Sequence, residues 1–387
     1  MSFNKKAIVY TDHEAFINRK KELNYLMDWT NRKPNEILFI YGPKSSGKTT
    51  LLMKFIEFNL NDKHYNIKHF NLRKVLIGNY IDFIQAFFEV DFSNASQEIK
   101  QRSEYSLKVF KLSKEIKQSL EKKILDPFVV MEKELQKIVK KGKRPIIIID
   151  ELQALEDIYM NGQKELLKEL FNFFVAMTKE SHLCHVIIAS SDGYFMKRIY
   201  EDSKLSKTSK YYAVDYLEET DTKYWLKHLE SESAITSFKL TDSQIDVIWK
   251  YFGGSMWEIS DILGELINCS KNKKISDEYI NIIIEKRIKE NFARFKHFSG
   301  FNENRQVLLE KIYHCCAKEN HFDHKDMKPL MKNKIFDENS LSHELNRLVQ
   351  LNYLAFDPTK TTWQLQGNSM FYGLKKYVEY IANDSIG

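Results

Sequence analysis

The segment that most constrains the fold of this chain is "LFIYGPKSSGKTTLL", residues 38–52. An apolar, β-rich run stops at Gly42, and a run with helical character starts at the glycine, lysine and threonine of residues 47–49. This is the pattern G-x-x-x-x-G-K-[ST] in its required context, with a strand before it and a helix after it. Because such a loop binds phosphate at the carboxyl end of a buried parallel strand, the segment predicts an α/β fold with a nucleotide site.

The chemistry of this loop depends on its glycines, its lysine and its last hydroxyl groups. Glycine lets the backbone wrap around phosphate groups without a clash of Cβ atoms, and the loop N–H groups then bind phosphate oxygens. Lys48 is expected to reach the β- and γ-phosphates, and Thr49 to hold Mg²⁺. The predicted nucleotide-binding residues are Gly42, Pro43, Lys44, Ser45, Ser46, Gly47, Lys48, Thr49 and Thr50.

An acidic motif, "IIIIDE" at residues 146–151, supplies the other half of a metal site. Asp150, at the end of an apolar strand, is placed to bind Mg²⁺ through water, and Glu151 to act as general base toward the attacking water. Adjacent carboxylates favour hydrolysis of ATP over phosphoryl transfer to a small molecule. We therefore assign Lys48, Asp150 and Glu151 to catalysis, and Thr49 and Asp150 to the metal.

A third polar cluster ends the predicted strand "HVIIASSD", residues 185–192. Since the carboxyl ends of parallel strands face the ligand, a serine here is a candidate to sense the γ-phosphate or to place the water. Ser191 is our choice for this catalytic role, and Ser190 is almost equally suitable. The alternative is a strand that simply ends in a polar loop.

Hydrophobic periodicity predicts a sheet domain at residues 1–217. Short apolar strands alternate there with helices, which indicates a parallel sheet covered on both faces. The expected strands are 36–41, 65–72, 144–150, 184–192 and 211–217. Between about 79 and 141 the pattern is lysine-rich and predicts a helical insertion. Its apolar residues near one face are Leu107, Phe110, Ile116, Leu120 and Ile124.

The rest of the chain predicts two smaller, mostly helical domains. A helical lid at 218–300 is expected from helices at 219–231, 242–252, 256–271 and 276–293. A winged-helix domain at 301–387 is expected from helices at 305–317, 324–332 and 339–350 and a β-hairpin around "DPTKT". Asn339 or Ser340 is the expected cap of the third of these helices.

Composition narrows the compartment and the class of partner. The net charge of +6 permits nucleic acid or an anionic surface as partner and requires neither. The four cysteines form no C-x-x-C pair, and "HCCAKENHFDH", residues 314–324, fits buried thiols on a helix better than a zinc site. Sparse unpaired cysteine predicts a cytoplasmic protein. The absence of an apolar run of about 18 residues predicts no membrane insertion.

Five segments together resemble one family. "FINRKKEL" (16–23), "YGPKSSGKTTLL", "IIIIDELQAL", "VIIASSDGYF" and "YFGGSMWEI" occur in the order seen in the archaeal-type P-loop ATPases. These ATPases belong to the AAA+/STAND class and are related to origin-recognition initiators. The resemblance covers residues 16–267, and it implies ATP with Mg²⁺ as ligands. It also implies that Ile17 and Arg19 lie by the adenine and ribose, and that Gly254 begins a lid helix near the base. An alternative is that Gly253 and Gly254 merely end helix 242–252.

The chain departs from the family pattern at three places. Asn18 stands where the family often has glycine, and Met256 stands where it usually has proline. Before the last predicted strand the family tends to carry a Gly–Arg pair, whereas this chain has "SKTSKYY" with Lys207 and Lys210. Lysine replaces a bidentate arginine finger poorly, and Arg198 is the nearest arginine. Slow hydrolysis, or an arginine supplied by a partner, is therefore expected.

Two hypotheses of function follow. The first is an ATP-hydrolysing switch that acts on double-stranded DNA or on a protein through the winged helix, whose outer face carries Ser342, His343, Asn346, Arg347 and Gln350. The second is a nucleotide-stabilised binding module with little turnover. An oligomer is compatible with both. A small-molecule kinase lacks an acceptor-binding motif here, and a GTPase lacks the N-K-x-D stretch.

Overall fold

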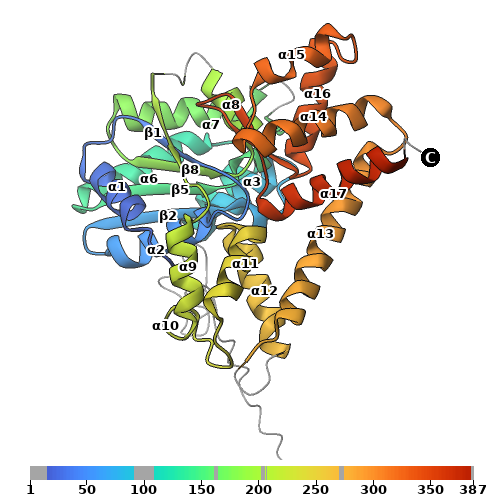
Figure 1. Ribbon diagram of the computed structural model, residues 1–387. Coiled ribbons are helices and arrows are strands. Elements are labelled where there is room, and N and C mark those ends of the chain that lie inside the picture. The colour runs from blue at the N-terminus through green and yellow to red at the C-terminus, as the bar shows by residue number, and fades with distance from the viewer. Residues whose placement is uncertain are drawn as a thin grey trace, which may run out of the picture.

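The structure, a computed structural model, describes residues 15–90, 109–160, 164–201, 205, 207–269 and 274–384. A sheet with flanking helices, a group of lid helices and a C-terminal module follow one another along the chain and meet at one edge of the sheet (Figure 1). Within the described ranges, no helix combines the length and the apolar character needed to cross a membrane.

The central sheet has five parallel strands in the order β2-β5-β8-β1-β9. They are β1 (Ile37–Tyr41), β2 (Tyr65–Asn71), β5 (Arg144–Asp150), β8 (His185–Ser190) and β9 (Ser209–Ala213). The register pairs Asn71 with Asp150 and Tyr41 with Ser190. The carboxyl ends of these strands therefore form one edge, and the predicted parallel sheet is confirmed.

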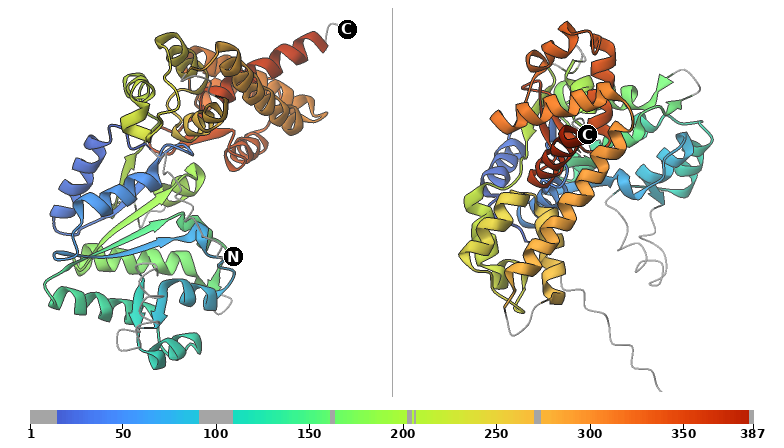
Figure 2. Two further views of the ribbon diagram at one scale, coloured as in Figure 1. Left: turned by 90° about the horizontal axis from the view of Figure 1, so that it is seen from below. Right: turned by 45° about the vertical axis from the view of Figure 1, so that its right-hand side comes forward.

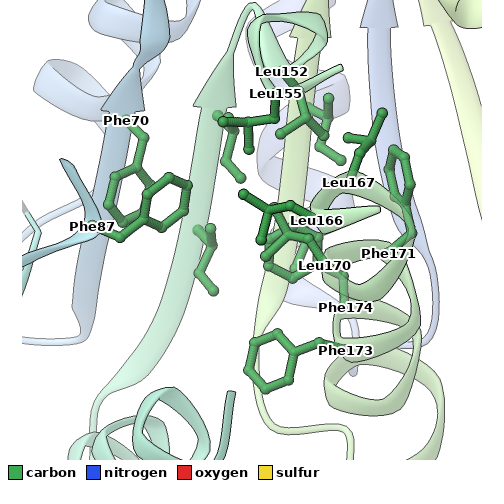
Figure 3. Close-up of a cluster of buried hydrophobic side chains, with 14 of the residues drawn as sticks. Phe70, Phe87, Leu152, Leu155, Leu166, Leu167, Leu170, Phe171, Phe173 and Phe174 are labelled. Atoms are coloured by element: carbon green, nitrogen blue, oxygen red, sulfur yellow. The ribbon is translucent and has the colours of Figure 1, made fainter. Parts of the chain in front are cut away.

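Helices cover both faces of this sheet (Figure 2). Helices α1 (Lys20–Asn31) and α2 (Lys48–Asn59) pack on one face; α6 (Pro127–Lys140), α7 (Leu166–Val175) and α8 (Gly193–Glu201) pack on the other. Burial on both faces explains why β5 and β8 are continuous apolar runs. In the core, the rings of Phe70 and Phe87 stack 4.1 Å apart, and Leu166, Leu170 and Phe174 turn toward the strands (Figure 3).

The predicted helical insertion is wrong in part. It contains α3 (Tyr80–Phe87), β3 (Phe88–Val90), β4 (Phe110–Leu112), α5 (Lys114–Glu121) and α6. Phe110 lies in a strand paired with Phe88, because its ring is buried against other aromatic rings of the core. Ser113 caps α5, so that the helix starts only after this strand. Ile124 is largely exposed in the following turn, and Leu107 lies outside the described residues.

Five helices form the lid: α9 (Glu219–Lys227), α10 (Leu229–Ser233), α11 (Asp242–Phe252), α12 (Met256–Cys269) and α13 (Asp277–Ser299). Gly253 caps α11 with φ 57°, and its N–H donates to Trp249 O at 2.8 Å. The reading of this glycine as a helix cap is therefore confirmed. A Cβ on Gly254 would lie 1.9 Å from Leu217 O, so that the start of α12 packs directly on the chain leaving the sheet.

The C-terminal module has the winged-helix outline. It consists of α14 (Glu303–Glu319), α15 (His324–Lys332), α16 (Glu338–Gln350), the antiparallel strands β10 (Leu354–Asp357) and β11 (Thr362–Leu365), and α17 (Asn368–Asp384). Asp337, rather than Asn339 or Ser340, caps α16, and Ser340 completes its capping box. Cys316 is buried in the core of this module.

Helix α17 was not foreseen, and it lies alongside α13 (Figure 1). Ile280 and Ile284 of α13 belong to the lid core, whereas Phe295 and Phe298 near its end belong to the core of the C-terminal module. One helix therefore joins the two parts, and the boundary at residue 300 falls immediately after it.

Candidate nucleotide-binding site

The loop between β1 and α2 has the backbone geometry of a phosphate cradle. Ser45 and Gly47 have φ values of 66° and 87°, and Gly47 is the N-cap of α2. Such left-handed turns direct successive N–H groups into one concavity, which is suited to an anion. A Cβ on Gly42 would lie 2.1 Å from Val214 O, so that only glycine lets the loop pass the chain that follows β9.

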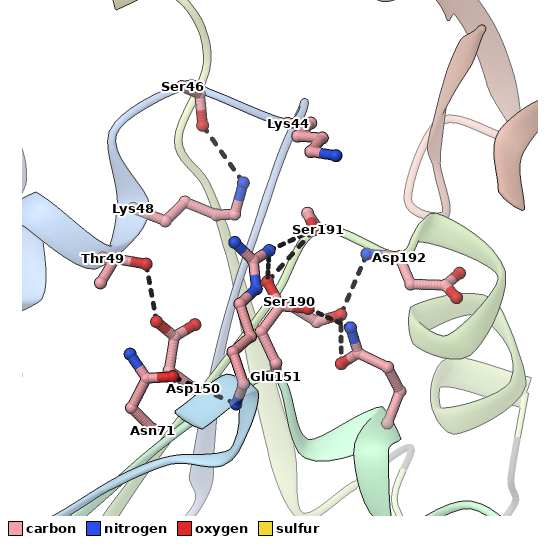
Figure 4. Close-up of polar contacts among 12 residues, drawn as sticks. Lys44, Ser46, Lys48, Thr49, Asn71, Asp150, Glu151, Ser190, Ser191 and Asp192 are labelled. Atoms are coloured by element: carbon pink, nitrogen blue, oxygen red, sulfur yellow. Dashed lines mark hydrogen bonds and ion pairs between the residues drawn. The ribbon is translucent and has the colours of Figure 1, made fainter. Parts of the chain in front are cut away.

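Lys48 lies across this loop (Figure 4). Its Nζ donates to the carbonyl oxygens of Gly42 and Pro43 at 3.0 and 2.7 Å and to Ser46 Oγ at 3.4 Å. Burial lowers the pKa of Lys48 to about 8, and the carboxylates of Glu151 and Asp150 oppose this effect. The ammonium group thus sits among carbonyl dipoles at the point where the motif requires a phosphate partner.

The two predicted metal ligands lie together. Thr49 Oγ1 donates to Asp150 Oδ2 at 2.6 Å, and Asp150 is buried at the end of β5 (Figure 4). A hydroxyl oxygen and a carboxylate oxygen are hard ligands of the kind that Mg²⁺ prefers. Together with the cradle and Lys48, this donor set fits a magnesium–nucleotide complex. Thr49 and Asp150 would hold the metal.

Glu151 is buried beside this pair, and both of its carboxylate oxygens are engaged. Its backbone is left-handed, with φ 63°, and its N–H donates to Ala189 O at 2.8 Å. Oε1 accepts hydrogen bonds from Arg73 and, at 3.2 Å, from Ser191 Oγ; Oε2 accepts one from Gln153. Glu151 thus lies beside the predicted metal ligands, and each of its oxygens already accepts at least one hydrogen bond.

The two serines that end β8 differ in their surroundings. Ser190 is fully buried, donates to Gln153 Oε1 at 3.0 Å and accepts from the N–H of Asp192 at 3.0 Å. Ser191 lines the cleft and contacts Glu151. Of the two, Ser191 therefore lies where the predicted catalytic role requires it, and Ser190 supports the turn.

Sequence reasoning missed Arg73. This side chain lines the cleft, contacts Glu151 and donates to Ser191 Oγ at 3.3 Å. It follows β2 by two residues, and the end of β2 pairs with the end of β5 at Asp150. A basic residue just beyond a strand that neighbours the acidic motif is the signal from which it could have been found.

Ile17, Arg19 and Gly254 lie behind the wall of the cleft. Arg19 is buried, and its guanidinium donates to Ser46 O at 2.8 Å and to Asp215 O at 2.9 Å. Ile17 belongs to the lid core. None of these three appears among the described residues that line the cleft, and their contact with the nucleoside stays a prediction. Arg19 ties the phosphate loop to the chain entering the lid.

The structure describes Asn18, which replaces the usual glycine of the family, and Arg198, the arginine nearest to the position of the missing finger. Asn18 has φ 41°, a left-handed conformation that glycine and asparagine adopt most readily. Arg198 forms an ion pair with Glu156 at 2.5 Å. Among the described residues that line the cleft, neither Arg198 nor Glu156 appears.

The cleft has a volume of about 740 Å³ and is walled by all three parts of the chain. This size is typical of sites for small ligands. The phosphate loop contributes Lys44, Ser45, Gly47, Lys48, Thr49 and Thr50 to the wall of the cleft. Gly42, Pro43 and Ser46 are not among the described residues of this wall, and Pro43 and Ser46 are buried. The lid contributes Met256, Trp257 and Glu258, and the C-terminal module contributes Gln366, Ser369 and Met370.

The C-terminal module touches the phosphate loop directly. Gln366 Oε1 accepts the N–H of Lys44 at 3.1 Å. At the start of the loop, the Tyr41 hydroxyl donates to Asp357 Oδ1 at 3.1 Å and lies 2.9 Å from Thr359 Oγ1, in the turn of the β10–β11 hairpin. The wing of the winged helix is therefore docked on the nucleotide cleft.

Comparison with known sequences identifies relatives along most of the chain. The profile of the ATPase domain predominantly from Archaea matches residues 16–262. An uncharacterised ATP-binding protein of Methanocaldococcus jannaschii is 32% identical over 371 residues, which cover 94% of this chain and 95% of that protein. Another from the same organism is 42% identical over 213 residues, or 55% of this chain, and the match spans 62% of its length.

Solved structures share the fold at low sequence identity. The Walker-type ATPase of Pyrococcus abyssi superposes with a TM-score of 0.62 at 16% identity, covering 94% of this chain and 97% of that one. The ORC2 protein of Aeropyrum pernix, in its ADPNP and ADP complexes, gives a TM-score of 0.53 at 10% identity, covering 95% and 96%. The predicted likeness to origin-recognition-type ATPases is thereby confirmed for the fold. With its catalytic motifs inside the matched range, the chain belongs to the family of ATPases found predominantly in Archaea.

Proposed function

We propose that this protein binds ATP with Mg²⁺, hydrolyses it slowly, and acts as a nucleotide-dependent switch on a DNA or protein partner. The observation that carries the proposal is that one cleft is walled by the phosphate loop, by Glu151 and by the docked C-terminal module. A ligand bound there contacts both the hydrolytic residues and the part that would meet a partner. The cytoplasmic location expected from the cysteines and any oligomeric assembly stay predictions.

The hydrolytic roles follow from the contacts. The loop N–H groups and Lys48 bind the phosphates, and Thr49 and Asp150 hold Mg²⁺, which supplies positive charge to the phosphate oxygens when bound. Glu151 takes a proton from the attacking water, for which a lone pair of one carboxylate oxygen must be free. Because Arg73 and Ser191 bond Oε1 and Gln153 bonds Oε2, the attacking water competes with these donors for Glu151.

The switch follows from the docking of the wing. Two residues near the start of the phosphate loop contact the C-terminal module: Tyr41, the last residue of β1, and Lys44, within the loop. When the loop closes around phosphates, its backbone N–H groups turn toward the ligand, and the hydrogen bond from the Lys44 N–H to Gln366 competes with that movement. ATP is therefore expected to loosen the wing from the cleft and to free it for a partner.

The second candidate function, a nucleotide-stabilised module with little turnover, is favoured by the engaged state of Glu151. The two candidates differ in what happens after ATP binds. A switch releases phosphate in each cycle, whereas the module retains ATP. Phosphate release measured under single-turnover conditions separates them.

A partner has two surfaces to use on the C-terminal module. The exposed face of α16 carries Ser342, His343 and Arg347, and it is accessible while the wing is docked. The hairpin turn at Thr359 contacts Tyr41, so that a partner of the wing must displace this contact. For DNA the test is a salt titration, since each phosphate contact adds to the salt dependence of the affinity. Binding that is absent even at low ionic strength would exclude DNA.

The test of the nucleotide assignment uses two site variants with matched controls. Lys48→Ala should abolish tight ATP binding in calorimetry, whereas Lys54→Ala, on the exposed side of the same helix, should leave it unchanged. Glu151→Gln should bind ATP and stop phosphate release. Unchanged affinity of Lys48→Ala would refute the nucleotide site, and wild-type turnover of Glu151→Gln would refute the general base. Stimulation of turnover by double-stranded DNA would identify the partner class.

A further inference from the structure

Glu258 is a buried carboxylate in the wall of the cleft that Lys48 and Glu151 also line. It occupies the third position of α12, only 8% of its surface is exposed, and it lines the cleft. Oε1 accepts a hydrogen bond from Ser369 Oγ of α17, and Ser369 Oγ in turn accepts one from Asn291 Nδ2 of α13 at 3.0 Å. Oε1 of this carboxylate is therefore held by Ser369 of the C-terminal module, which is in turn held by Asn291 of the lid.

The other oxygen of Glu258 is unsatisfied. Oε2 is buried and has no hydrogen-bond partner within the described ranges, although the Ser255 hydroxyl lies near enough to the carboxylate to act on its pKa. Burial raises the pKa of Glu258, against the opposing effects of Ser369, Arg287 and Ser255. A buried acceptor left without a donor costs on the order of 1–3 kcal/mol, so that such groups in native proteins usually have a partner. Because Glu258 lines the cleft, a donor on a bound ligand is a candidate partner for Oε2.

A glycine of the C-terminal module lies beside Oε2. A Cβ added to Gly367 would lie 3.1 Å from Oε2 and 3.9 Å from the Tyr216 hydroxyl. With φ 90°, this position strongly favours glycine and places no side chain in front of the carboxylate. A bulkier residue at this position would lie against Oε2, whereas glycine leaves that side of the carboxylate without a side chain.

The wall around Glu258 meets the phosphate loop at Gly47 and Lys44. Met256, two residues before it, places Sδ 3.1 Å from a Cβ built on Gly47, and the Tyr216 hydroxyl donates to Lys44 O at 3.0 Å. Trp257, half-exposed, adds apolar surface to the same wall. When a nucleotide places its phosphates in the loop, Thr49, Asp150 and Glu151 face the phosphates. The wall that contains Glu258 is then available to the nucleoside.

We propose that Glu258 recognises the nucleoside of the bound nucleotide, with Oε2 accepting a hydrogen bond from a neutral donor, either a ribose hydroxyl or the exocyclic amino group of adenine. This rests on the proposed function, since the phosphate loop must hold the phosphates. It assigns selectivity for ATP to a residue outside the phosphate loop and the acidic motif. Ser369 is a positioning residue that orients the carboxylate from α17.

The experiment compares four nucleotides by calorimetry with Mg²⁺: ATP, 2′-deoxyATP, 3′-deoxyATP and ITP, in which an oxygen replaces the amino group. The wild-type protein should bind at least one analogue more weakly than ATP, on the order of tenfold to a hundredfold, as expected for a lost hydrogen bond to a carboxylate. A deoxy analogue that binds weakly identifies the ribose as donor, and weak binding of ITP identifies the amino group. Because all four carry the same phosphates, their ratios isolate the nucleoside contact.

Glu258→Gln should reduce these ratios to near one, since its amide places a donor where the nucleoside donor must lie. Glu265→Gln, on the exposed side of the same helix, should keep the wild-type ratios, and Ser369→Ala should reduce them in part. Melting temperatures check that each variant folds. Wild-type protein that binds all four nucleotides equally, or Glu258→Gln that keeps the ratios, would overturn the proposal while ATP binding stands. Wild-type protein that binds no nucleotide would overturn the proposed function as well.

Discussion

The contact between Arg73 and Glu151 predicts that an arginine restrains hydrolysis in the free protein. Oε1 of Glu151 accepts from Arg73, which also donates to Ser191. Glu151 is 8% exposed at its side chain, whereas Arg73 is 52% exposed. Removal of Arg73 leaves Ser191 on Oε1 and Gln153 on Oε2, and it frees one lone pair of Oε1 for water. Arg73→Ala should therefore raise the basal rate of ATP hydrolysis.

The size of the effect follows from the two exposures. A hydrogen bond to a charged acceptor contributes about 1.5–3 kcal/mol when buried, and an exposed ion pair about 0–1 kcal/mol. With one partner buried and the other half in solvent, the restraint on Glu151 is about 1–2 kcal/mol. Since about 1.4 kcal/mol corresponds to a factor of ten in rate, turnover at saturating ATP should rise by about 5- to 30-fold.

The assay is phosphate release at saturating ATP and Mg²⁺, in single-turnover and steady-state form. Arg73→Ala combined with Glu151→Gln should be inactive, because the gain acts through the general base. Arg198→Ala, which breaks an exposed pair with Glu156, is the matched control and should leave the rate unchanged. A fall in turnover of tenfold or more on Arg73→Ala would refute the reasoning, since Arg73 would then stabilise the transition state. An unchanged rate would show that its contact with Glu151 does not limit hydrolysis.

Three further perturbations test separate features of the structure. Gly254→Ala should destabilise the protein by several kcal/mol in chemical denaturation, because its Cβ would lie 1.9 Å from Leu217 O. Gly264→Ala, in the following helix α12 with open space around it, should be neutral or slightly stabilising, and equal effects of the two substitutions would contradict the close packing. Burial lowers the pKa of His185 to about 4, so that between pH 6.5 and pH 4 this histidine binds a proton in the unfolded chain but not in the folded protein. As the pH falls over this range, the free energy of unfolding of the wild-type protein should therefore decrease by about 3 kcal/mol more than that of His185→Phe. Parallel pH profiles of the two proteins would contradict the lowered pKa of His185. Thr49→Val should bring the ATP affinity in Mg²⁺ down to the value without Mg²⁺, and a retained Mg²⁺ effect would remove this hydroxyl from the metal site.

The sequence predicted well what is local along the chain. The phosphate loop is one continuous segment, and the apolar runs before Gly42 and Asp150 determine that both motifs end buried strands. The proximity of Thr49 and Asp150 then follows from the parallel sheet, whose strands end at one edge. Helices 242–252 and 324–332 were predicted to the residue because each starts at a capping box.

Single polar side chains brought in from distant segments were not predictable. Arg73 reaches Glu151 across 78 positions, and Ser369 reaches Glu258 across 111. Hydrophobic periodicity identifies the faces of helices and strands, but a lone arginine or serine leaves no periodic signal. The prediction of a helical insertion was wrong in part for a related reason. The spacing of Phe110 fits an apolar helix face, but Phe110 packs against Phe88 and Phe70 and lies in a strand.

The two ends of the cleft therefore differ in how far the sequence reveals them. The phosphate end is built from residues of the motifs, whose spacing is set by the chemistry of phosphate and Mg²⁺. The other end is built where α12, α13 and α17 meet, and its buried carboxylate is held by Ser369 from the C-terminal module. If Glu258 binds the nucleoside, the C-terminal module contacts the nucleotide site at both ends: through Gln366 at the phosphate loop and through Ser369 at the nucleoside. A movement of that module would then change phosphate binding and nucleoside selectivity together, which a wing docked on the phosphate loop alone would not do.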